Sequence, residues 1–263
     1  AARYGVLAKG GGEAFEKASR VGVVVFDKTG TLTVGGEPKV TDFEVFAEDE
    51  EEILAALRVV EENSSHPVAK AIVAFCAAKT SSRANITSLE ELPGRGICAT
   101  LSTNVELAVG NESLLSSMSI PVPQQILNTL GQWQSEAKST ALVAIRRGSD
   151  SPWTVSAALA ITDPIRPEAP RVLHTLQHTL GLRVWMLSGD NPRTARAVAS
   201  RLGIPLDQVL AGVLPTGKAD AIKQIQASVR AQRSPSKVST RGAKGMVAMV
   251  GDGINDSPAL ATA

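Results

Sequence analysis

The chain has 263 residues, enough for two domains of ordinary size, and 43% of them are hydrophobic, enough for packed cores. The formal net charge of +1 excludes a general attraction to nucleic acid, so we expect no nucleic-acid partner. The sequence contains neither a signal peptide nor the roughly 18 uncharged apolar residues of a membrane span. We therefore expect a soluble, monomeric chain.

One apolar run, residues 23–26, ends directly at a carboxylate, Asp27. Its β-branched residues are typical of a parallel strand that is buried on both faces. Ligands of α/β sheets bind at the carboxyl ends of such strands. Lys28, Thr29 and Gly30 add a cation, a hydroxyl and a backbone that a ligand can approach closely. An isolated Asp would more often be an exposed turn residue, but this set is suited to holding a phosphoryl group that a carboxylate attacks.

The remaining chain predicts two kinds of architecture. Residues 37–160 carry helical patterns at 53–62 and 68–78 and paired strands at 140–146 and 153–161, which indicates an α+β domain. After Asp163 the helices and strands alternate, which predicts a parallel doubly wound sheet. The helices of that part are expected at residues 167–180, 192–202 and 216–227, and the strands at 183–187, 209–211 and 246–250.

Polar residues follow the predicted strands of the second part. Ser188, Gly189 and Asp190 place a hydroxyl and a flexible backbone at one strand end. The last strand leads into a Gly-rich turn with two carboxylates and an amide: Asp252, Asn255 and Asp256. These carboxylates would repel one another without a cation, so the turn predicts a hard metal ion with oxygen ligands.

The seven-residue run Asp-Lys-Thr-Gly-Thr-Leu-Thr that begins at Asp27 resembles the phosphorylation motif of the P-type ATPases. The resemblance covers essentially the whole chain and keeps the order of the family's motifs. It implies an α/β fold: a haloacid dehalogenase-like Rossmann domain with an inserted α+β nucleotide-binding domain. The implied limits are residues 1–36 and 161–263 for the phosphorylation domain and 37–160 for the inserted domain.

The same resemblance implies roles for individual residues. Asp27 would accept the γ-phosphate of ATP, and Lys218 would neutralise charge on the phosphoryl group. Mg²⁺ would be bound by Asp27, the Thr29 carbonyl and Asp252. The other catalytic residues of the match support the phosphoryl group: Thr29, Ser188 (where the family has Thr), Gly189, Asp190, Asn255 and Asp256.

A second group of motifs resembles the nucleotide site of the heavy-metal subgroup. His66 stands directly before Pro67, and Glu61 precedes it by five residues. Gly94 and Gly96 form a Gly-x-Gly, and Asn111 follows Gly110. Taken singly, these features have ordinary explanations: a solvated histidine, a turn, and an Asn that caps a helix. Together they imply an ATP site formed by Glu61, His66, Gly94, Gly96, Ile97, Gly110 and Asn111.

The family implies ATP and Mg²⁺ as cofactors, and an actuator domain and membrane domain elsewhere in the parent chain. The chain would lie at the cytosolic face of a membrane and drive transport of a soft metal ion, with Cu(I) expected first and Ag⁺, Cd²⁺ and Zn²⁺ as alternatives. A soluble phosphatase of the haloacid dehalogenase type is the alternative enzyme. Such phosphatases carry a second Asp two residues after the nucleophile, and Thr29 stands there. A non-catalytic nucleotide-sensing module would be expected to lack Asp27, Lys218 or Asp252.

The segment from Ser228 to Gly245 fits none of these motifs. It is basic, with no acidic residue. We expect a solvated loop there, and a regulatory or docking site is the alternative.

Overall fold

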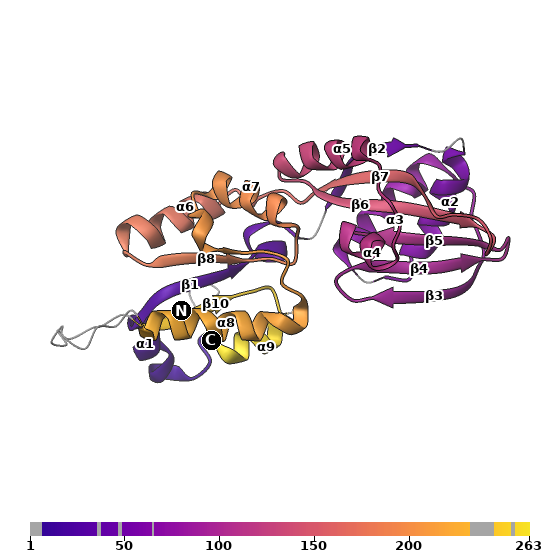
Figure 1. Cartoon of the computed structure of the whole chain (residues 1–263). Coiled ribbons are helices and arrows are strands. Elements are labelled where there is room, and N and C mark those ends of the chain that lie inside the picture. Colours follow the sequence, from indigo (N-terminus) through magenta and orange to yellow (C-terminus); the bar gives the residue numbers. More distant parts are fainter. Residues whose placement is uncertain (1–6, 36–37, 47–48, 65, 232–244, 254–255) are drawn as a thin grey trace. The chain divides into compact units, whose positions relative to one another are not determined.

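The computed structural model describes residues 7–35, 38–46, 49–64, 66–231, 245–253 and 256–263. The chain forms two compact units (Figure 1). The first unit comprises the chain up to Leu32, Arg166–Gly189 and the part from Ala199 onward. The second comprises Thr33–Ile165 and Asp190–Val198. No helix in the described part of the chain has the length and apolarity needed to cross a bilayer.

The first unit is built on a parallel sheet with the strand order β10-β1-β8-β9. The central strand β1 (Val21–Asp27) pairs on one side with β10 (Met246–Val250) and on the other with β8 (Arg183–Leu187). The short strand β9 (Val209–Leu210) completes the sheet beside β8. The predicted parallel sheet is confirmed, and β1 is buried as its apolar sequence requires.

The helices of this part largely follow the prediction. They are α1 (Gly11–Ser19), α6 (Ala169–His174), α7 (Pro192–Leu202), α8 (Lys218–Ala231) and α9 (Ser257–Thr262); the residues of α7 up to Val198 belong to the second unit. Helix α8 packs its apolar side on the sheet, where Ile222 and Ile225 join Val23 and Val25 in one core. The expected loop from Ser228 is wrong at its start, because α8 continues to Ala231 and buries Val229 in this core. Residues 232–244 of that segment lie outside the described residues.

The second unit is an antiparallel sheet with the strand order β2-β7-β6-β5-β4-β3. The predicted pair of strands at 140–146 and 153–161 is confirmed as β6 and β7, which pair antiparallel. The strands are β2 (Lys39–Val45), β3 (Ile86–Leu92), β4 (Gly96–Leu101), β5 (Val105–Gly110), β6 (Ser139–Arg147) and β7 (Thr154–Thr162).

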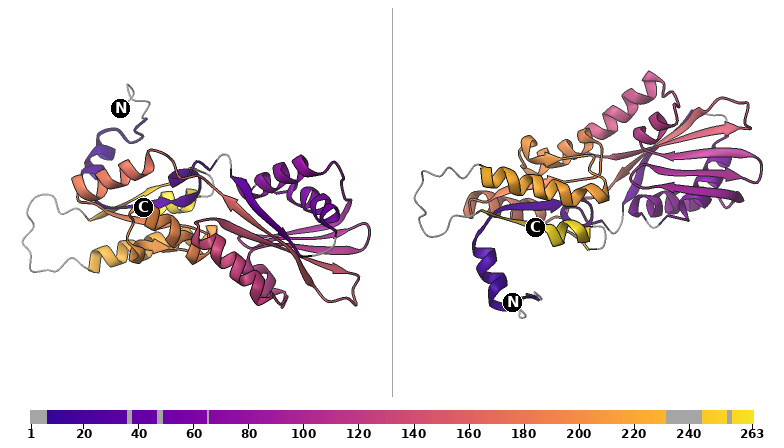
Figure 2. Two further views of the ribbon diagram at one scale, coloured as in Figure 1. Left: turned by 90° about the horizontal axis from the view of Figure 1, so that it is seen from above. Right: turned by 60° about the horizontal axis from the view of Figure 1, so that its bottom comes forward.

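Helices cover both faces of this sheet (Figure 2). Helices α2 (Glu50–Glu61) and α3 (Pro67–Lys79) pack on one face, and α4 (Glu112–Ser117) and α5 (Gln124–Ser135) on the other. Strand β5 shows the alternation that two covered faces require: Leu107 and Val109 enter the core under α2 and α3, and Ala108 the core under α4 and α5. The inserted α+β domain is therefore a two-faced sheet with two cores.

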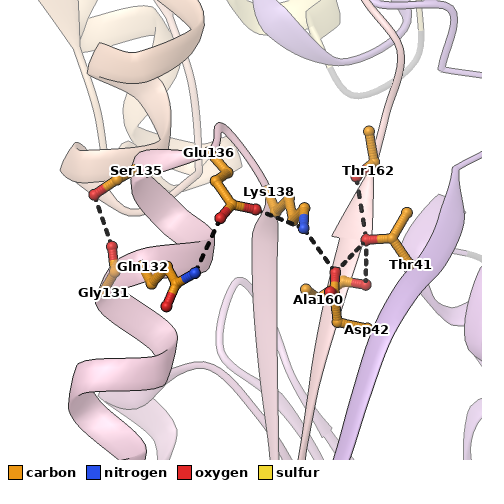
Figure 3. A network of polar contacts seen from close by, with 9 residues as sticks. All are labelled: Thr41, Asp42, Gly131, Gln132, Ser135, Glu136, Lys138, Ala160 and Thr162. Carbon is orange, nitrogen blue, oxygen red and sulfur yellow. Dashed lines mark hydrogen bonds and ion pairs between the residues drawn. The ribbon is translucent and has the colours of Figure 1, made fainter.

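A polar network joins the end of α5 to strand β2 (Figure 3). The ammonium of Lys138 lies 2.8 Å from Asp42 and 2.7 Å from Glu136. Thr41 donates a hydrogen bond to the same Asp42 carboxylate at 2.7 Å. Burial raises the pKa of Asp42, but the hydrogen bonds from Lys138 and Thr41 outweigh burial and hold that pKa below its ordinary value. Asp42 is therefore a charged anchor for Lys138 at neutral pH.

Helix α5 ends in a left-handed turn at Ala137, whose φ is 64°. The Lys138 amide donates back to the Trp133 carbonyl at 3.1 Å, which is the hydrogen bond of a Schellman motif. Glycine is the usual residue at this position because a Cβ strains the left-handed conformation.

We predict that Ala137→Gly stabilises the second unit by about 0.5–1 kcal/mol, because it removes this strain. Urea unfolding followed through the amide NMR signals of that unit measures the change. Ala74→Gly is the matched control, since Ala74 is exposed inside α3 and should lose about 1 kcal/mol. A loss of stability in Ala137→Gly would contradict the prediction.

Candidate active site

The site in the first unit is centred on Asp27, the last residue of β1, which is only 4% exposed. The ammonium of Lys218, the first residue of α8, donates to Asp27 Oδ1 at 2.6 Å and to Asp256 Oδ1 at 2.7 Å. Asp256 is fully buried, and Lys218 is 8% exposed. One cation thus bridges two buried carboxylates that come from opposite ends of the sequence.

The charges of this cluster are interdependent. Burial raises the pKa of Asp27 to about 6, Lys218 works against that rise, and the carboxylates of Asp256 and Asp252 add to it. For Lys218, burial lowers the pKa, but its hydrogen bonds to Asp256 and Asp27 outweigh burial and leave the pKa above its ordinary value. Asp27 is therefore mostly ionised at neutral pH and pairs with a charged lysine, the state that a nucleophilic carboxylate needs.

The glycines around Asp27 leave space for carboxylates. Gly30 lies in the turn Lys28–Leu32 with φ 77°, and a Cβ there would collide with the Asp252 carboxylate. A Cβ at Gly251 would collide with the Asp256 carboxylate. Asp252 and Asp256 therefore lie against backbone that only glycine can provide, which explains glycine at both positions.

The donor set fits a hard divalent cation. Asp252 and Asp256 both raise the pKa of Asp27, so these carboxylates lie close to Asp27 and to Lys218. Asp256 Oδ2 is buried and has no hydrogen-bond partner among the described residues. Carboxylate oxygens are the ligands that Mg²⁺ prefers. In the described part of the chain no group of three or more His, Cys, Asp or Glu side chains is arranged to hold a metal. The expected ligand set has two carboxylates, and its third ligand is the Thr29 carbonyl. The absence of a three-side-chain group therefore does not test this set, which stays a prediction.

The structure places the other predicted catalytic residues in different surroundings. Ser188 follows β8 directly, is 2% exposed, and lies one residue after Leu187, the register partner of Asp27. Its amide donates to the Leu210 carbonyl at 2.9 Å, and this contact fixes the strand end that Gly189 continues. Asp190 belongs to the second unit and accepts a hydrogen bond from Ser139 at 3.3 Å. Asn255 lies outside the described residues.

In the second unit, strand pairing assembles the predicted nucleotide-site glycines. Gly96 and Gly110 are register partners on β4 and β5, and a Cβ on either would collide with neighbouring backbone. Asn111 caps α4 by accepting from the Leu114 amide at 3.1 Å, and its side chain donates to the Gly94 carbonyl at 2.9 Å. The cap interpretation of Asn111 is therefore confirmed, and the same side chain also fixes the turn at Gly94. Ile97 is 3% exposed and belongs to the core.

Two residues that the sequence did not indicate, Ser64 and Glu91, connect Glu61 and His66 to this region. Burial raises the pKa of Glu61 to about 7, and the Glu91 carboxylate adds to the rise. The Ser64 hydroxyl donates to Glu91 at 3.3 Å and accepts from the His66 amide at 3.2 Å. Since Glu91 pairs with Ile97 in the β3–β4 ladder, Glu61, His66 and the glycine turn are brought together.

His66 is exposed and begins α3 as its cap. Its Nδ1 accepts from the Val68 amide at 3.2 Å, and Pro67 follows in the first turn, where proline is favoured. The structural role of a helix cap therefore accounts for part of this motif. The opposite ring nitrogen is not used by that contact.

Asp163, expected at the return from the inserted domain, links the two connecting segments of the second unit. Its carboxylate accepts from the Thr33 hydroxyl at 2.5 Å and from the Gly35 amide at 2.9 Å. The side chain ties residues that are far apart in sequence.

A buried aspartate at the end of the central parallel strand, a lysine from a later helix and an aspartate just before α9 thus meet at one end of the parallel sheet. The sequence profile of the haloacid dehalogenase-like hydrolases matches residues 21–263, and the chain belongs to that family. The predicted fold class is thereby confirmed.

Similarity to transport ATPases covers the whole chain. A copper-exporting P-type ATPase of Staphylococcus haemolyticus (strain JCSC1435) is 38% identical, and one of Staphylococcus aureus (strain JH9) is 35% identical, each over 100% of this chain. The chain spans 29% of the length of each.

Two solved structures agree with these relatives. The catalytic domain of the CPx-ATPase CopB-B is 25% identical with a TM-score of 0.67, over 97% of this chain and 80% of that one. A zinc-transporting PIB-type ATPase is 32% identical with a TM-score of 0.56, over 100% of this chain and 38% of that one. The resemblance to heavy-metal P-type ATPases, first seen in the motifs, is confirmed.

We predict that Lys218→Met lowers the free energy of unfolding of the first unit by about 3–5 kcal/mol at pH 7.5 in metal-free buffer, because it leaves two buried carboxylates without their cation. The loss should shrink at pH 5. Removing Lys218 raises the pKa of Asp27 further above 6, so Asp27 is then protonated at pH 5 in the folded state. Urea unfolding at both pH values tests this. The control Lys223→Met removes an exposed partner of Asp220 on the same helix and should change stability by less than about 0.5 kcal/mol. Equal losses in the two variants would contradict the prediction.

The Glu61 carboxyl gives a pH-dependent prediction for the second unit. Its folded-state pKa of about 7 lies above that of the unfolded chain, so the stability it contributes is fully present at low pH and is lost as the pH rises through 7. Glu91→Gln removes the neighbouring charge and should lower the pKa of Glu61, which a ¹³C NMR titration of the carboxyl measures. Glu90→Gln on the same strand should leave that pKa in place. An unchanged Glu61 pKa in Glu91→Gln would sink the assignment.

Proposed function

We propose that this chain is the ATP-binding catalytic core of a heavy-metal transporting P-type ATPase. In the proposed reaction an Asp27 carboxylate oxygen attacks the γ-phosphorus of ATP in line. A new O–P bond forms at Asp27, the bond from the γ-phosphorus to the β–γ bridging oxygen breaks, and ADP leaves. The observation that carries the proposal is the buried Asp27–Lys218–Asp256 cluster at the end of the central strand.

Each residue of the cluster has a part in this reaction. Lys218 holds Asp27 in its ionised form and presents positive charge where the phosphoryl group arrives. Asp256 fixes the lysine ammonium from the other side. Asp27, the Thr29 carbonyl and Asp252 would hold Mg²⁺, which supplies charge neutralisation of the phosphates when bound. Ser188 and Gly189, at the end of the adjacent strand, would contact the phosphoryl oxygens.

The position two residues after the nucleophile separates this reaction from that of a phosphatase. Thr29 stands where a phosphatase of this type carries its acid/base Asp. A threonine hydroxyl cannot activate water as a carboxylate does, so the aspartyl phosphate would persist. A persistent phosphorylated state is what a transporter needs to couple hydrolysis to movement of an ion, and the actuator domain of the parent chain would later remove the phosphate.

In the second unit we propose that ATP binds where Glu61, His66, the Gly94–Gly96 turn and Gly110–Asn111 converge. The two glycines of the β4–β5 ladder let the backbone of this region pack closely, since a Cβ on either would collide with neighbouring backbone, and the base would lie against the turn that this packing forms. Asn111 holds the turn at Gly94 in place, and His66 begins a helix beside it. Ile97 adds an apolar support from the core.

We propose Cu(I) as the transported ion and the cytosolic face of a membrane as the location of the chain. The two bacterial relatives named above are copper exporters, which supports copper, while a zinc transporter shares the fold. The ion would pass through a membrane domain of the parent chain. The catalytic chemistry described here does not depend on which ion that is.

We predict that the chain incubated with Mg²⁺ and ATP labelled at the γ-phosphate acquires a label that hydroxylamine removes, because acyl phosphates react with that nucleophile. Asp27→Asn should take up no label. The control Asp207→Asn, at an exposed position of the same unit, should behave like the wild type. A wild-type chain that remains unlabelled but steadily hydrolyses small phosphate esters would favour the phosphatase instead.

A further inference from the structure

Arg166 is the first residue of the first unit after the inserted domain, and it contacts the turn that follows Asp27. Its Nη2 donates to the Gly30 carbonyl at 2.9 Å, and its Nε donates to the Thr31 carbonyl at 3.1 Å. Its own backbone amide donates to the Leu32 carbonyl at 3.0 Å. One residue therefore holds three successive carbonyl groups of the turn Lys28–Leu32.

This turn has an unusual backbone that needs such support. Thr29 is extended, with ψ 125°, and Gly30 is left-handed, with φ 77°. Asp252 packs closely against Gly30, since a Cβ there would collide with its carboxylate. The carbonyls of Gly30 and Thr31 are turned to Arg166. The direction of the Thr29 carbonyl, which precedes them, depends on the same backbone conformation.

The surroundings of Arg166 are largely apolar and would not replace the hydrogen bonds that its guanidinium donates to the turn. A small cavity of about 90 Å³ next to the guanidinium is lined largely by apolar groups, among them Phe26, Leu32 and Leu173. Thr31 also lines this cavity, and its hydroxyl is buried with no hydrogen-bond partner in the described part of the chain. A shorter or apolar side chain at position 166 would therefore leave carbonyl groups facing an apolar space, at a cost in stability and in order of the turn.

We propose that Arg166 is a positioning residue of the phosphorylation site: its guanidinium fixes the turn after Asp27 so that the Thr29 carbonyl and the Asp27 carboxylate are presented together to Mg²⁺ and phosphate. This inference rests on the proposed function. Arg166 acts through the backbone, because the neighbouring charges that shift the pKa of Asp27 are those of Lys218, Asp256 and Asp252. Lysine at this position would reach one carbonyl as a point donor, whereas the planar fork of arginine reaches two.

Fluoroberyllate, a tetrahedral phosphate mimic that bonds to carboxylates, tests the inference without requiring turnover of ATP. Its Mg²⁺-dependent binding is measured by ¹⁹F NMR in the wild type, Arg166→Met, Arg166→Lys and Arg171→Met. Loss of a residue that orients metal ligands weakens binding about 10–100-fold. We expect a weakening in this range for Arg166→Met, a smaller one for Arg166→Lys, and a change of less than about twofold for Arg171→Met, which removes an exposed arginine of α6.

The outcomes separate the inference from the function on which it rests. The proposed function is overturned if the wild-type chain does not bind fluoroberyllate. It is also overturned if Asp27→Asn binds fluoroberyllate as tightly as the wild type does. Wild-type affinity in a folded Arg166→Met, with the amide signals of residues 28–32 unmoved, overturns the inference alone. Should Arg166→Met fail to fold, Arg166→Lys decides: binding equal to the wild type overturns the inference, and weaker binding with intact folding supports it. An Asp27 pKa that stays near 6 while affinity falls agrees with an effect through the backbone.

Discussion

The ammonium of Lys218 between the carboxylates of Asp27 and Asp256 is the interaction on which the first unit depends. A buried ion cluster contributes little net stability, because desolvation of the charges offsets their attraction. The cluster matters because it brings together three residues from distant parts of the chain. Asp27 ends the first strand of the sheet, Lys218 begins α8, and Asp256 lies just before α9, so the cluster forms only when distant parts of the chain have folded together. A site built in this way exists only in the folded state.

Parallel pairing supplies the rest of the geometry. Because β1 lies between β8 and β10, the ends of three strands meet beside Asp27. The chain can therefore bring Ser188 and Asp252 to one edge without any local sequence relation between them. Glycine at positions 30 and 251 then leaves the carboxylates room against the backbone. The pattern of small and charged residues at the strand ends follows from the topology.

The sequence predicted the structure best where a pattern of residues has one common structural explanation. The apolar run before Asp27 predicted a buried strand, which is confirmed. The Gly-rich acidic turn predicted a metal ion with oxygen ligands, and that site stays a prediction. Strand β3 could not be seen, because most of its side chains are exposed and no apolar alternation marks it, so Glu91 was missed with it. Arg166 was missed for another reason: the hydrogen bonds from its side chain to the turn go to backbone carbonyls, and no residue type in the turn signals a need for a donor. Contacts of this kind emerge only from three-dimensional structure.

Each unit contains a buried carboxyl group with a raised pKa, and the two groups differ in the charge of their neighbour. Burial raises the pKa of both Asp27 and Glu61. Beside Asp27 lies a lysine, which restrains the rise to about 6 and leaves a mostly charged carboxylate at neutral pH. Beside Glu61 lies another carboxylate, Glu91, which adds to the rise and brings the pKa to about 7. At neutral pH, Glu61 is therefore divided between a charged acceptor and a neutral group that also donates a hydrogen bond. Burial is the largest cause of both shifts, and the neighbouring charge opposes it at Asp27 and adds to it at Glu61.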